Sequence, residues 1–219
     1  MTYLMSDLHG RYEAYRRMLE LIRFSESDEL YVLGDVLDRG PQPLEILLDM
    51  RARPRVHPIL GNHEHTAYPI LRALTRGEHP PADAWLADGG ESTLAGFVRL
   101  SPKEQRAAVD YLATFAPYAE LTAGGADYLL VHAGLADFDP SRPLSAYPVA
   151  DLVAGRTDYT RRYYPDRYLV TGHTPTGLIA YGHGGRIWQG NGHVALDCGN
   201  GWGGTLGCLR LEDMAEFYV

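Results

Sequence analysis

Residues 3–15 read YLMSDLHGRYEAY and hold the pattern that decides the fold. A short apolar run ends just before Asp7 and His9, and Gly10 separates the two from a helical pattern that begins near Tyr12. Side chains two positions apart on a strand point to the same side, so Asp7 and His9 can converge where the chain turns. The pair suggests a metal ion, although for one such pair a helix-capping Asp beside a hydrogen-bonded His is the more ordinary explanation.

The same arrangement returns further along the chain. Residues 29–34 (ELYVLG) form a second strand-like run that is followed by Asp35, and residues 56–60 (VHPIL) form a third that is followed by Asn62. Helical patterns separate the three runs, at residues 12–22 and 43–50. The order strand, helix, strand, helix, strand predicts a parallel sheet. Loops that leave the carboxyl ends of parallel strands gather at one edge, where ligands bind, so we expect these polar residues to be neighbours.

The second half of the chain adds one clear helix and many strands. In residues 101–115 (SPKEQRAAVDYLATF), Ser101 is a predicted N-cap and Glu104 completes a capping box. From Tyr118 onward strand patterns dominate, apart from an irregular stretch at 137–167. We therefore expect an α/β fold in one domain, residues 1–219, with two central mixed sheets packed together, helices outside, and the site at the strand-end edge.

Composition limits the possible partners and location. The 219 residues carry a formal charge of −8, and the chain has no run of Lys or Arg that would follow a phosphate backbone, so no nucleic acid partner is expected. No apolar stretch approaches the roughly 20 residues that cross a bilayer, and the N-terminus has no signal-peptide pattern. We expect a cytoplasmic protein without a membrane partner. Cys198 and Cys208 lack metal-site spacing and are expected to be buried thiols.

Two later strand-like runs also end in polar residues, at His132 and His173. Asp, Asn and Gly are common in turns, but turns do not require His, so five such strand ends are hard to assign to turn chemistry alone. The candidate ligands are two carboxylates, one carboxamide and three imidazoles, namely Asp7, His9, Asp35, Asn62, His132 and His173. This set suits Mn, Fe, Zn or Co. Six groups exceed the needs of one structural zinc and fit two metals that share a carboxylate, with Asp35 as the natural bridge.

Five ordered motifs carry a resemblance to a known family. They are SDLHG (6–10), GDVLDRG (34–40), GNHE (61–64), VHAG (131–134) and GHTP (172–175). Together they resemble the PPP-type metallophosphoesterases, the group of serine/threonine phosphoprotein phosphatases, their short bacterial and phage relatives, and symmetrical diadenosine tetraphosphatases. The resemblance runs from Met1 to about Gly204 and implies a sandwich of two mixed sheets in four layers, α/β/β/α. Ser6 and Ala133 stand where the family often has Gly, and both are small enough for the turns.

The resemblance also implies roles for individual residues. One metal would take Asp7, His9 and Asp35, and the second would take Asp35, Asn62, His132 and His173. His63 would be the general acid, Asp38 would orient it, and Arg39 would hold the phosphoryl group. Arg156 is the candidate for a second phosphate clamp, with Arg161 and Arg162 as competitors. The three tryptophans, Trp85, Trp188 and Trp202, are expected to pack rather than to form a substrate platform, although Trp202 could line the cleft edge.

The leading interpretation is a hydrolase of phosphoserine and phosphothreonine in proteins, and of small aryl phosphates. Two divalent ions, in the first place Mn with Fe or Zn as alternatives, would provide a bridging hydroxide that attacks phosphorus directly. A symmetrical dinucleoside polyphosphate hydrolase is the nearest alternative, because it uses the same metals with base-stacking aromatics and extra cations around them. A metal-binding module without turnover is the alternative of another class. The sequence leaves the oligomeric state open.

Overall fold

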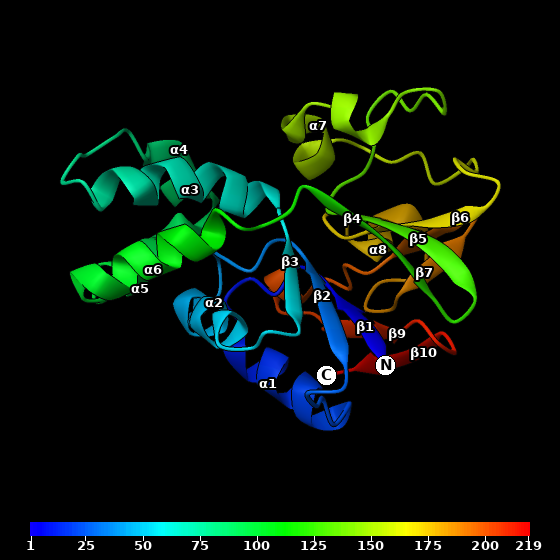
Figure 1. Cartoon of the computed structure of the whole chain (residues 1–219), viewed down its shortest axis with the longest axis horizontal. Coiled ribbons are helices and arrows are strands. Elements are labelled where there is room, and N and C mark those ends of the chain that lie inside the picture. The colour runs from blue at the N-terminus through cyan, green and yellow to red at the C-terminus, as the bar shows by residue number, and fades with distance from the viewer.

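The computed structural model describes residues 1–219 and builds two five-stranded sheets (Figure 1). The first sheet has the order β10-β9-β1-β2-β3 and the second the order β4-β5-β6-β8-β7. The strands of the first sheet are β1 (Thr2–Met5), β2 (Glu29–Leu33), β3 (Val56–Ile59), β9 (Gly207–Arg210) and β10 (Ala215–Tyr218). Those of the second are β4 (Tyr118–Ala123), β5 (Ala126–Val131), β6 (Arg167–Thr171), β7 (Trp188–Gly190) and β8 (His193–Ala195). Both sheets are mixed, as predicted.

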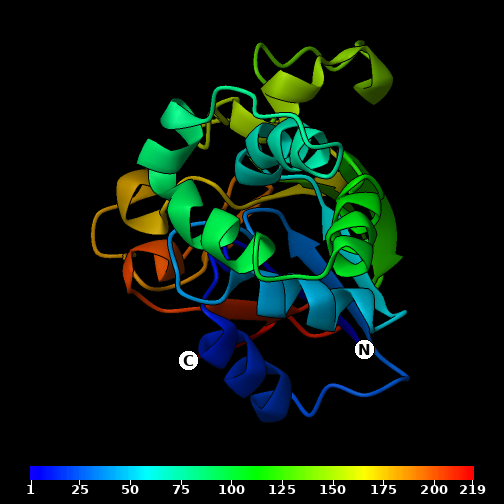
Figure 2. The ribbon, with the colours of Figure 1, turned by 90° about the vertical axis from the view of Figure 1, so that its left-hand side faces the viewer.

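Eight α-helices connect and cover the strands. They are α1 (Tyr12–Leu21), α2 (Pro43–Arg51), α3 (Asn62–Leu74), α4 (Asp83–Trp85), α5 (Glu91–Phe97), α6 (Pro102–Leu112), α7 (Val149–Ala154) and α8 (Thr176–Ile179). Single turns of other helix types occur at Leu86–Gly90, Leu144–Ala146 and Asn200–Trp202. Figure 2 looks at the molecule from the side of α3 to α6 and shows these helices in front of the sheets. No helix combines the length and the apolar character needed to span a membrane.

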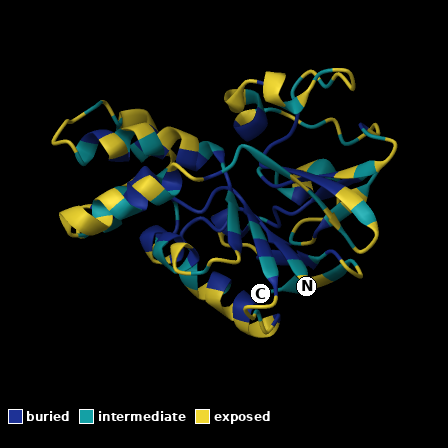
Figure 3. Cartoon of the chain, in the orientation of Figure 1, coloured by how far each residue is buried: buried dark blue, intermediate teal, exposed yellow.

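Alternating side chains on the strands divide the interior into layers. In β1, Tyr3 and Met5 pack with α1, α2 and the α3 to α6 helices, whereas Leu4 points into the space between the two sheets. In β5, Leu130 meets Leu4 in the intersheet core, and Leu129 packs on the opposite face with residues of α7 and its flanking loops. Buried residues accordingly run along the strands, and the exposed ones lie on the outer helix faces and loops (Figure 3). The layers are α/β/β/α, which confirms the expected fold class.

Parallel pairing brings the carboxyl ends of six strands to one edge of the sandwich. Strands β1, β2 and β3 are parallel in the first sheet, and β5, β6 and β8 are parallel in the second. Each of the five predicted site segments leaves one of these strands at its carboxyl end. The predicted gathering of polar residues at one edge is therefore confirmed.

Local predictions differ in how well they match the structure. Helix α6 begins as predicted, since the Ser101 side chain accepts the Glu104 N–H and the Glu104 carboxylate accepts the Ser101 N–H. Cys198 and Cys208 are free and buried. The stretch predicted to be irregular contains α7, a helix of 6 residues that is too short for its periodicity to stand out. Strand β10 was not predicted, because its four residues at the C-terminus carry no turn signal after them.

Candidate active site

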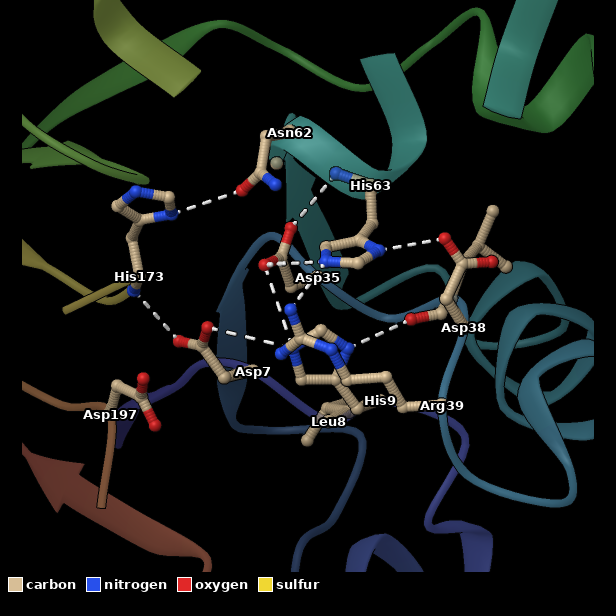
Figure 4. Close-up of polar contacts among 12 residues, drawn as sticks. Asp7, Leu8, His9, Asp35, Asp38, Arg39, Asn62, His63, His173 and Asp197 are labelled. Atoms are coloured by element: carbon tan, nitrogen blue, oxygen red, sulfur yellow. Dashed lines mark hydrogen bonds and ion pairs between the residues drawn. The ribbon is translucent and has the colours of Figure 1, made fainter. Parts of the chain in front are cut away.

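Asp35 lies at the centre of the strand-end edge, among His9, Asn62 and His63 (Figure 4), and each of its carboxylate oxygens lies close to a histidine. Its Oδ2 is 3.6 Å from Nε2 of His9, and its Oδ1 is 3.3 Å from Nε2 of His132. Each imidazole donates its Nδ1–H to a backbone carbonyl, His9 to Leu37 at 3.0 Å and His132 to Leu33 at 2.6 Å. Histidines that bind metals are commonly held in this way, with the other nitrogen directed at the ion. The two oxygens of the Asp35 carboxylate therefore lie next to two different histidine nitrogens that could bind metal.

The second half of the site brings together an amide and two imidazoles. Asn62 is the first residue of α3, and its Oδ1 lies 3.1 Å from Nε2 of His132 and 3.0 Å from Nδ1 of His173. Donor atoms of Asp35, His132 and His173 lie within 4.8 Å of one another. These atoms are spaced closely enough to surround one ion, and they belong to three of the four residues that the resemblance implies for the second metal.

Asp7 completes the other half less closely. Its Oδ1 is 4.0 Å from Nε2 of His9, while its Oδ2 accepts the backbone N–H of His173 at 3.0 Å. The tightest group of donor atoms here consists of His9, Asp35 and His63, so Asp7 is further from the centre of this group than the resemblance implied. One oxygen of Asp7 is engaged with the loop after β6, and the other is the one nearest to His9.

Burial and neighbouring charges shift the pKa values of the three histidines in the donor cluster. Burial lowers the pKa of His9 to about 3, and burial together with the neighbouring His132 lowers that of His173 to about 4. Burial also lowers the pKa of His132, but the charge of Asp35 outweighs it and raises the pKa to about 10. The donor set of carboxylate, carboxamide and imidazole groups fits divalent ions, which bind the neutral form of an imidazole.

His63 and Asp38 form a separate pair beside the donor cluster. Nδ1 of His63 lies 2.7 Å from Oδ2 of Asp38, and both side chains are buried. Asp38 also accepts the indole N–H of Trp85 at 2.9 Å and the hydroxyl of Thr93 at 2.6 Å. Burial lowers the pKa of His63, but the hydrogen bond to Asp38 and the charge of Asp35 raise it above its usual value. The imidazole is therefore fixed in orientation, with Nε2 directed toward the site.

Arg39 lies across the mouth of the site. Its guanidinium donates to Nε2 of His9 at 2.8 Å and to Nε2 of His63 at 2.9 Å. It also lies 4.4 Å from the ring centroid of Trp202. A guanidinium and a metal ion cannot share the lone pair of one imidazole, so Arg39 must leave His9 when a metal binds there. The guanidinium, which also lies 3.6 Å from the Asp88 carboxylate, can then meet an anion at the same mouth.

Arg156 lines a hollow next to the donor cluster. The hollow has a volume of about 500 Å³, and His173, Thr174 and Leu178 form part of its wall. Arg161 pairs with Asp158 at 3.7 Å, whereas Arg156 is exposed and forms no ion pair. Of the three arginines considered from the sequence, Arg156 is the one that faces open space beside the site.

The site is built on strained backbone. Ten residues other than glycine have positive φ angles, and six of them are predicted site residues: Asp7, His9, Asp35, Asp38, Arg39 and His173. A left-handed conformation costs a residue with a Cβ atom roughly 1 to 2 kcal/mol. Gly34 precedes Asp35 with φ of +75°, and a Cβ there would lie 2.6 Å from His132 Nδ1. Only glycine fits at position 34, where the loop after β2 passes close to Gly61 and His132.

The buried carboxylate of Glu64 joins the loops that follow β2 and β3. Oε2 accepts the backbone N–H groups of Asp35 at 2.8 Å and Gly61 at 3.1 Å, and Oε1 accepts those of Val36 at 2.8 Å and Leu37 at 2.9 Å. The side chain is fully buried, and burial with the nearby Asp35 charge raises the pKa of Glu64 to about 7. One carboxylate therefore satisfies four donors that would otherwise be unpaired.

We expect Glu64→Gln to lower the free energy of unfolding by about 2 to 4 kcal/mol, because the amide NH₂ cannot accept the N–H groups that one carboxylate oxygen now accepts. Urea-induced unfolding in the presence of a chelator would measure this change. The matched control is Glu45→Gln, which alters the third residue of α2, an exposed position with no hydrogen-bond partner. Equal losses in the two variants would contradict the role given to Glu64.

Several residues of the site were not among the predicted ones. Asp197 is buried beside Asp7 (Figure 4), and its charge contributes to a pKa of Asp7 well above the usual value, although burial is the larger cause. Trp85 packs as expected but also binds Asp38. Trp202 does not pack in a core, since its exposed fraction is 72%, and its position over Arg39 agrees with the alternative that it lines the cleft edge. It lies on a glycine-rich turn, so its indole extends over Arg39 instead of into a core.

Comparison with known proteins places this geometry in a family. The calcineurin-like phosphoesterase model matches residues 2–197. Serine/threonine-protein phosphatase 2 of Escherichia coli K12 is 32% identical over 153 residues, which cover 68% of this chain and 64% of that protein, slightly under two thirds of its length. The symmetrical bis(5'-nucleosyl)-tetraphosphatase of Methylococcus capsulatus is 27% identical over 260 aligned positions, covering 99% of this chain and 94% of the relative.

A solved structure provisionally named a diadenosine tetraphosphatase superimposes on the whole chain with a TM-score of 0.72. It shares 16% sequence identity and is covered over 92% of its length, so the likeness concerns the fold. The five ordered motifs, the four layers and the family match agree with one another. This chain belongs to the calcineurin-like phosphoesterase family and resembles its PPP-type members.

Proposed function

We propose that this protein hydrolyses phosphomonoesters, namely phosphoserine and phosphothreonine in proteins and small aryl phosphates. The observation that supports this most is the buried His63 and Asp38 pair, at 2.7 Å, whose outer imidazole nitrogen, Nε2, lies by the metal-donor atoms of His9 and Asp35 and within 2.9 Å of Arg39. A module that only stored or sensed metal would have no use for this pair or for Arg39 at the mouth. Phosphoesterase chemistry is therefore favoured over a binding role.

The metal assignments are part of the proposal. Asp7, His9 and Asp35 would hold one divalent ion, and Asp35, Asn62, His132 and His173 would hold the other, with Mn proposed first and Fe or Zn as alternatives. The two oxygens of Asp35 face His9 and His132 separately, which supports the shared carboxylate. The chemistry that such ions supply when bound is Lewis acidity toward the phosphoryl oxygens and a water molecule of lowered pKa.

The side chains of the protein would bind the phosphoryl group and protonate the leaving group. Arg39, and Arg156 across the hollow, would hold phosphoryl oxygens, since planar guanidinium groups match a phosphate well. Once Arg39 has moved from Nε2 of His63 to the phosphoryl group, that nitrogen would hold a proton and donate it to the leaving oxygen as the bond between that oxygen and phosphorus breaks. Asp38 would keep the imidazole oriented and favour its charged form. Water enters as the new substituent on phosphorus, and the alcohol leaves protonated.

A symmetrical dinucleoside tetraphosphate hydrolase is the second candidate. The relative of that name from Methylococcus capsulatus aligns along nearly the whole of both chains. The exposed Trp202 also offers an aromatic face close to Arg39, as base stacking would require. Against this, the alignment has 260 positions for the 219 residues of this chain, so the relative carries segments that have no counterpart here.

One activity panel separates the two candidates. The Mn-loaded protein is given a phosphoserine peptide, p-nitrophenyl phosphate and diadenosine tetraphosphate, and phosphate release and nucleotide products are measured. We expect a higher kcat/KM for the peptide and the aryl phosphate than for the dinucleotide. Hydrolysis of diadenosine tetraphosphate to ADP as the preferred reaction would favour the second candidate. Absence of turnover with all three would contradict both.

Metal removal gives a further expected result. Treatment with a chelator should abolish hydrolysis of p-nitrophenyl phosphate, and added Mn should restore it, because the donor cluster supplies no substitute for the ions. Zn and Fe are added in parallel to rank the metals. Full activity after exhaustive chelation, with metal content verified by mass spectrometry, would refute a metal-dependent reaction.

A further inference from the structure

Asp88 lies at the mouth of the site and has no part in the roles described so far. It belongs to the turn at Leu86–Gly90, and its side chain is 60% exposed. One carboxylate oxygen is 3.7 Å from Nε2 of His63, and the other is 3.6 Å from the Arg39 guanidinium. This places a negative charge next to the nitrogen that the proposed function assigns to the leaving group.

The position of Asp88 is fixed by neighbouring contacts. The carbonyl of Gly89 accepts the backbone N–H of Arg39 at 2.9 Å, and a Cβ on Gly89, which has φ of +101°, would lie 2.8 Å from Arg39 Cγ. Gly90 packs equally closely on the ring of Trp85, whose indole N–H is bound to Asp38. The turn that carries Asp88 is therefore joined on both sides to the Asp38 and Arg39 loop.

This carboxylate is not needed to orient the acid. Nδ1 of His63 is already bound to Asp38, which in turn has two further donors in Thr93 and Trp85. Asp88 instead lies 3.7 Å from Nε2, the nitrogen that the proposed function directs at the leaving group. A negative charge at this point offsets part of the positive charge of Arg39, and it attracts cationic groups and repels anionic ones. The Trp202 indole over Arg39 adds an aromatic face that suits apolar or cationic groups.

We propose that Asp88 and Trp202 form a leaving-group subsite that accepts neutral or cationic groups and disfavours anionic ones. This rests on the proposed phosphoesterase function and narrows its substrate class. Esters of uncharged alcohols, and phosphopeptides with basic residues next to the phosphorylated one, are the preferred substrates. Polyphosphates, whose leaving group is itself an anion, are poor ones.

The test uses two aryl phosphates that differ in leaving-group charge, 4-carboxyphenyl phosphate and 4-(trimethylammonio)phenyl phosphate. The two esters differ in intrinsic reactivity. This difference cancels when the ratio of their kcat/KM values in a variant is divided by the same ratio in the wild type. In Asp88→Asn, kcat/KM for the carboxyphenyl ester should rise relative to that for the trimethylammonio ester by about 3- to 30-fold, as expected for removal of one charge near the protein surface. The change should diminish as salt is added. Asp88→Lys should shift the ratio further in the same direction.

The matched control is Asp83→Asn, which removes an exposed carboxylate from the preceding α4 helix. It should leave the ratio unchanged while lowering the net negative charge equally. An unchanged ratio in both Asp88 variants, with both esters still hydrolysed, would overturn the subsite, as would an equal shift in the Asp83 variant. A wild-type, Mn-loaded protein that hydrolyses neither ester would refute the proposed function itself, and with it the substrate class inferred here.

Discussion

Asp35→Asn is expected to abolish measurable turnover and to lower the metal content from two ions to less than one per chain. The carboxylate faces His9 and His132 with different oxygens, at 3.6 and 3.3 Å, so its charge serves both proposed ions at once. An amide keeps the shape but loses the negative charge, and its NH₂ group cannot bind a cation. Metal content by mass spectrometry after gel filtration, and activity on p-nitrophenyl phosphate with added Mn, measure the two effects.

The control for this variant is Asp110→Asn, an exposed carboxylate on α6 with no ion pair. It should retain both metals and full activity. Circular dichroism should show that the Asp35 variant is folded, since Glu64 continues to hold the surrounding loop. Two tightly bound metals in the Asp35 variant would contradict the shared carboxylate, whatever the activity.

His63→Asn is expected to slow turnover by about 10²- to 10⁴-fold, the range for general acid catalysis, while both metals remain bound. The loss should depend on the leaving group. p-Nitrophenolate departs with little need for a proton, whereas a serine alkoxide needs one, so the deficit should be larger for a phosphoserine peptide than for p-nitrophenyl phosphate. Values of kcat for the two substrates, with metal content measured on the same samples, test this directly.

His65→Asn is the matched control, because it makes the same substitution at an exposed position two residues further along α3. It should leave both reactions unchanged. Asp38→Asn should show the same dependence on the leaving group more mildly, since Asp38 orients the imidazole and gives no proton itself. Loss of metal in the His63 variant, or equal deficits for the two substrates with chemistry rate-limiting, would contradict the acid role.

The sequence predicted the fold and the location of the site because both depend on the same repeated signal. A strand followed by Asp, Asn or His and then by Gly or Pro marks the carboxyl end of a parallel strand, and five such ends were recognised. Asp197 shows the same signal, two residues after β8 and two before Gly199, and could have been recognised as a sixth. It was missed because β8 has only three residues, so its apolar pattern merged with the turn that follows.

Other parts of the site leave no periodic trace in the sequence. Asp88 lies in a turn between short helices, and an Asp beside two glycines reads as an ordinary loop residue. For Trp202 the sequence favoured packing and left a place at the cleft edge as the alternative, because apolar side chains are usually buried and its exposure depends on the two glycines around it. Their contacts with His63 and Arg39 arise only when distant segments meet, and neither spacing nor composition carries that information.

The six left-handed residues of the site have a consequence for engineering. Glycine adopts positive φ without strain, whereas these six residues do not. The backbone strain at the positions where the chemistry would take place therefore amounts to several kcal/mol. Selection for heat resistance alone would favour glycine wherever the relief of this strain exceeds the loss of side-chain contacts, which at Asp38 include the donors of Trp85 and Thr93. The selected variants would be more stable but would lack side-chain atoms that the proposed metal ions need. Selection for durability in this scaffold has to be coupled to selection for turnover.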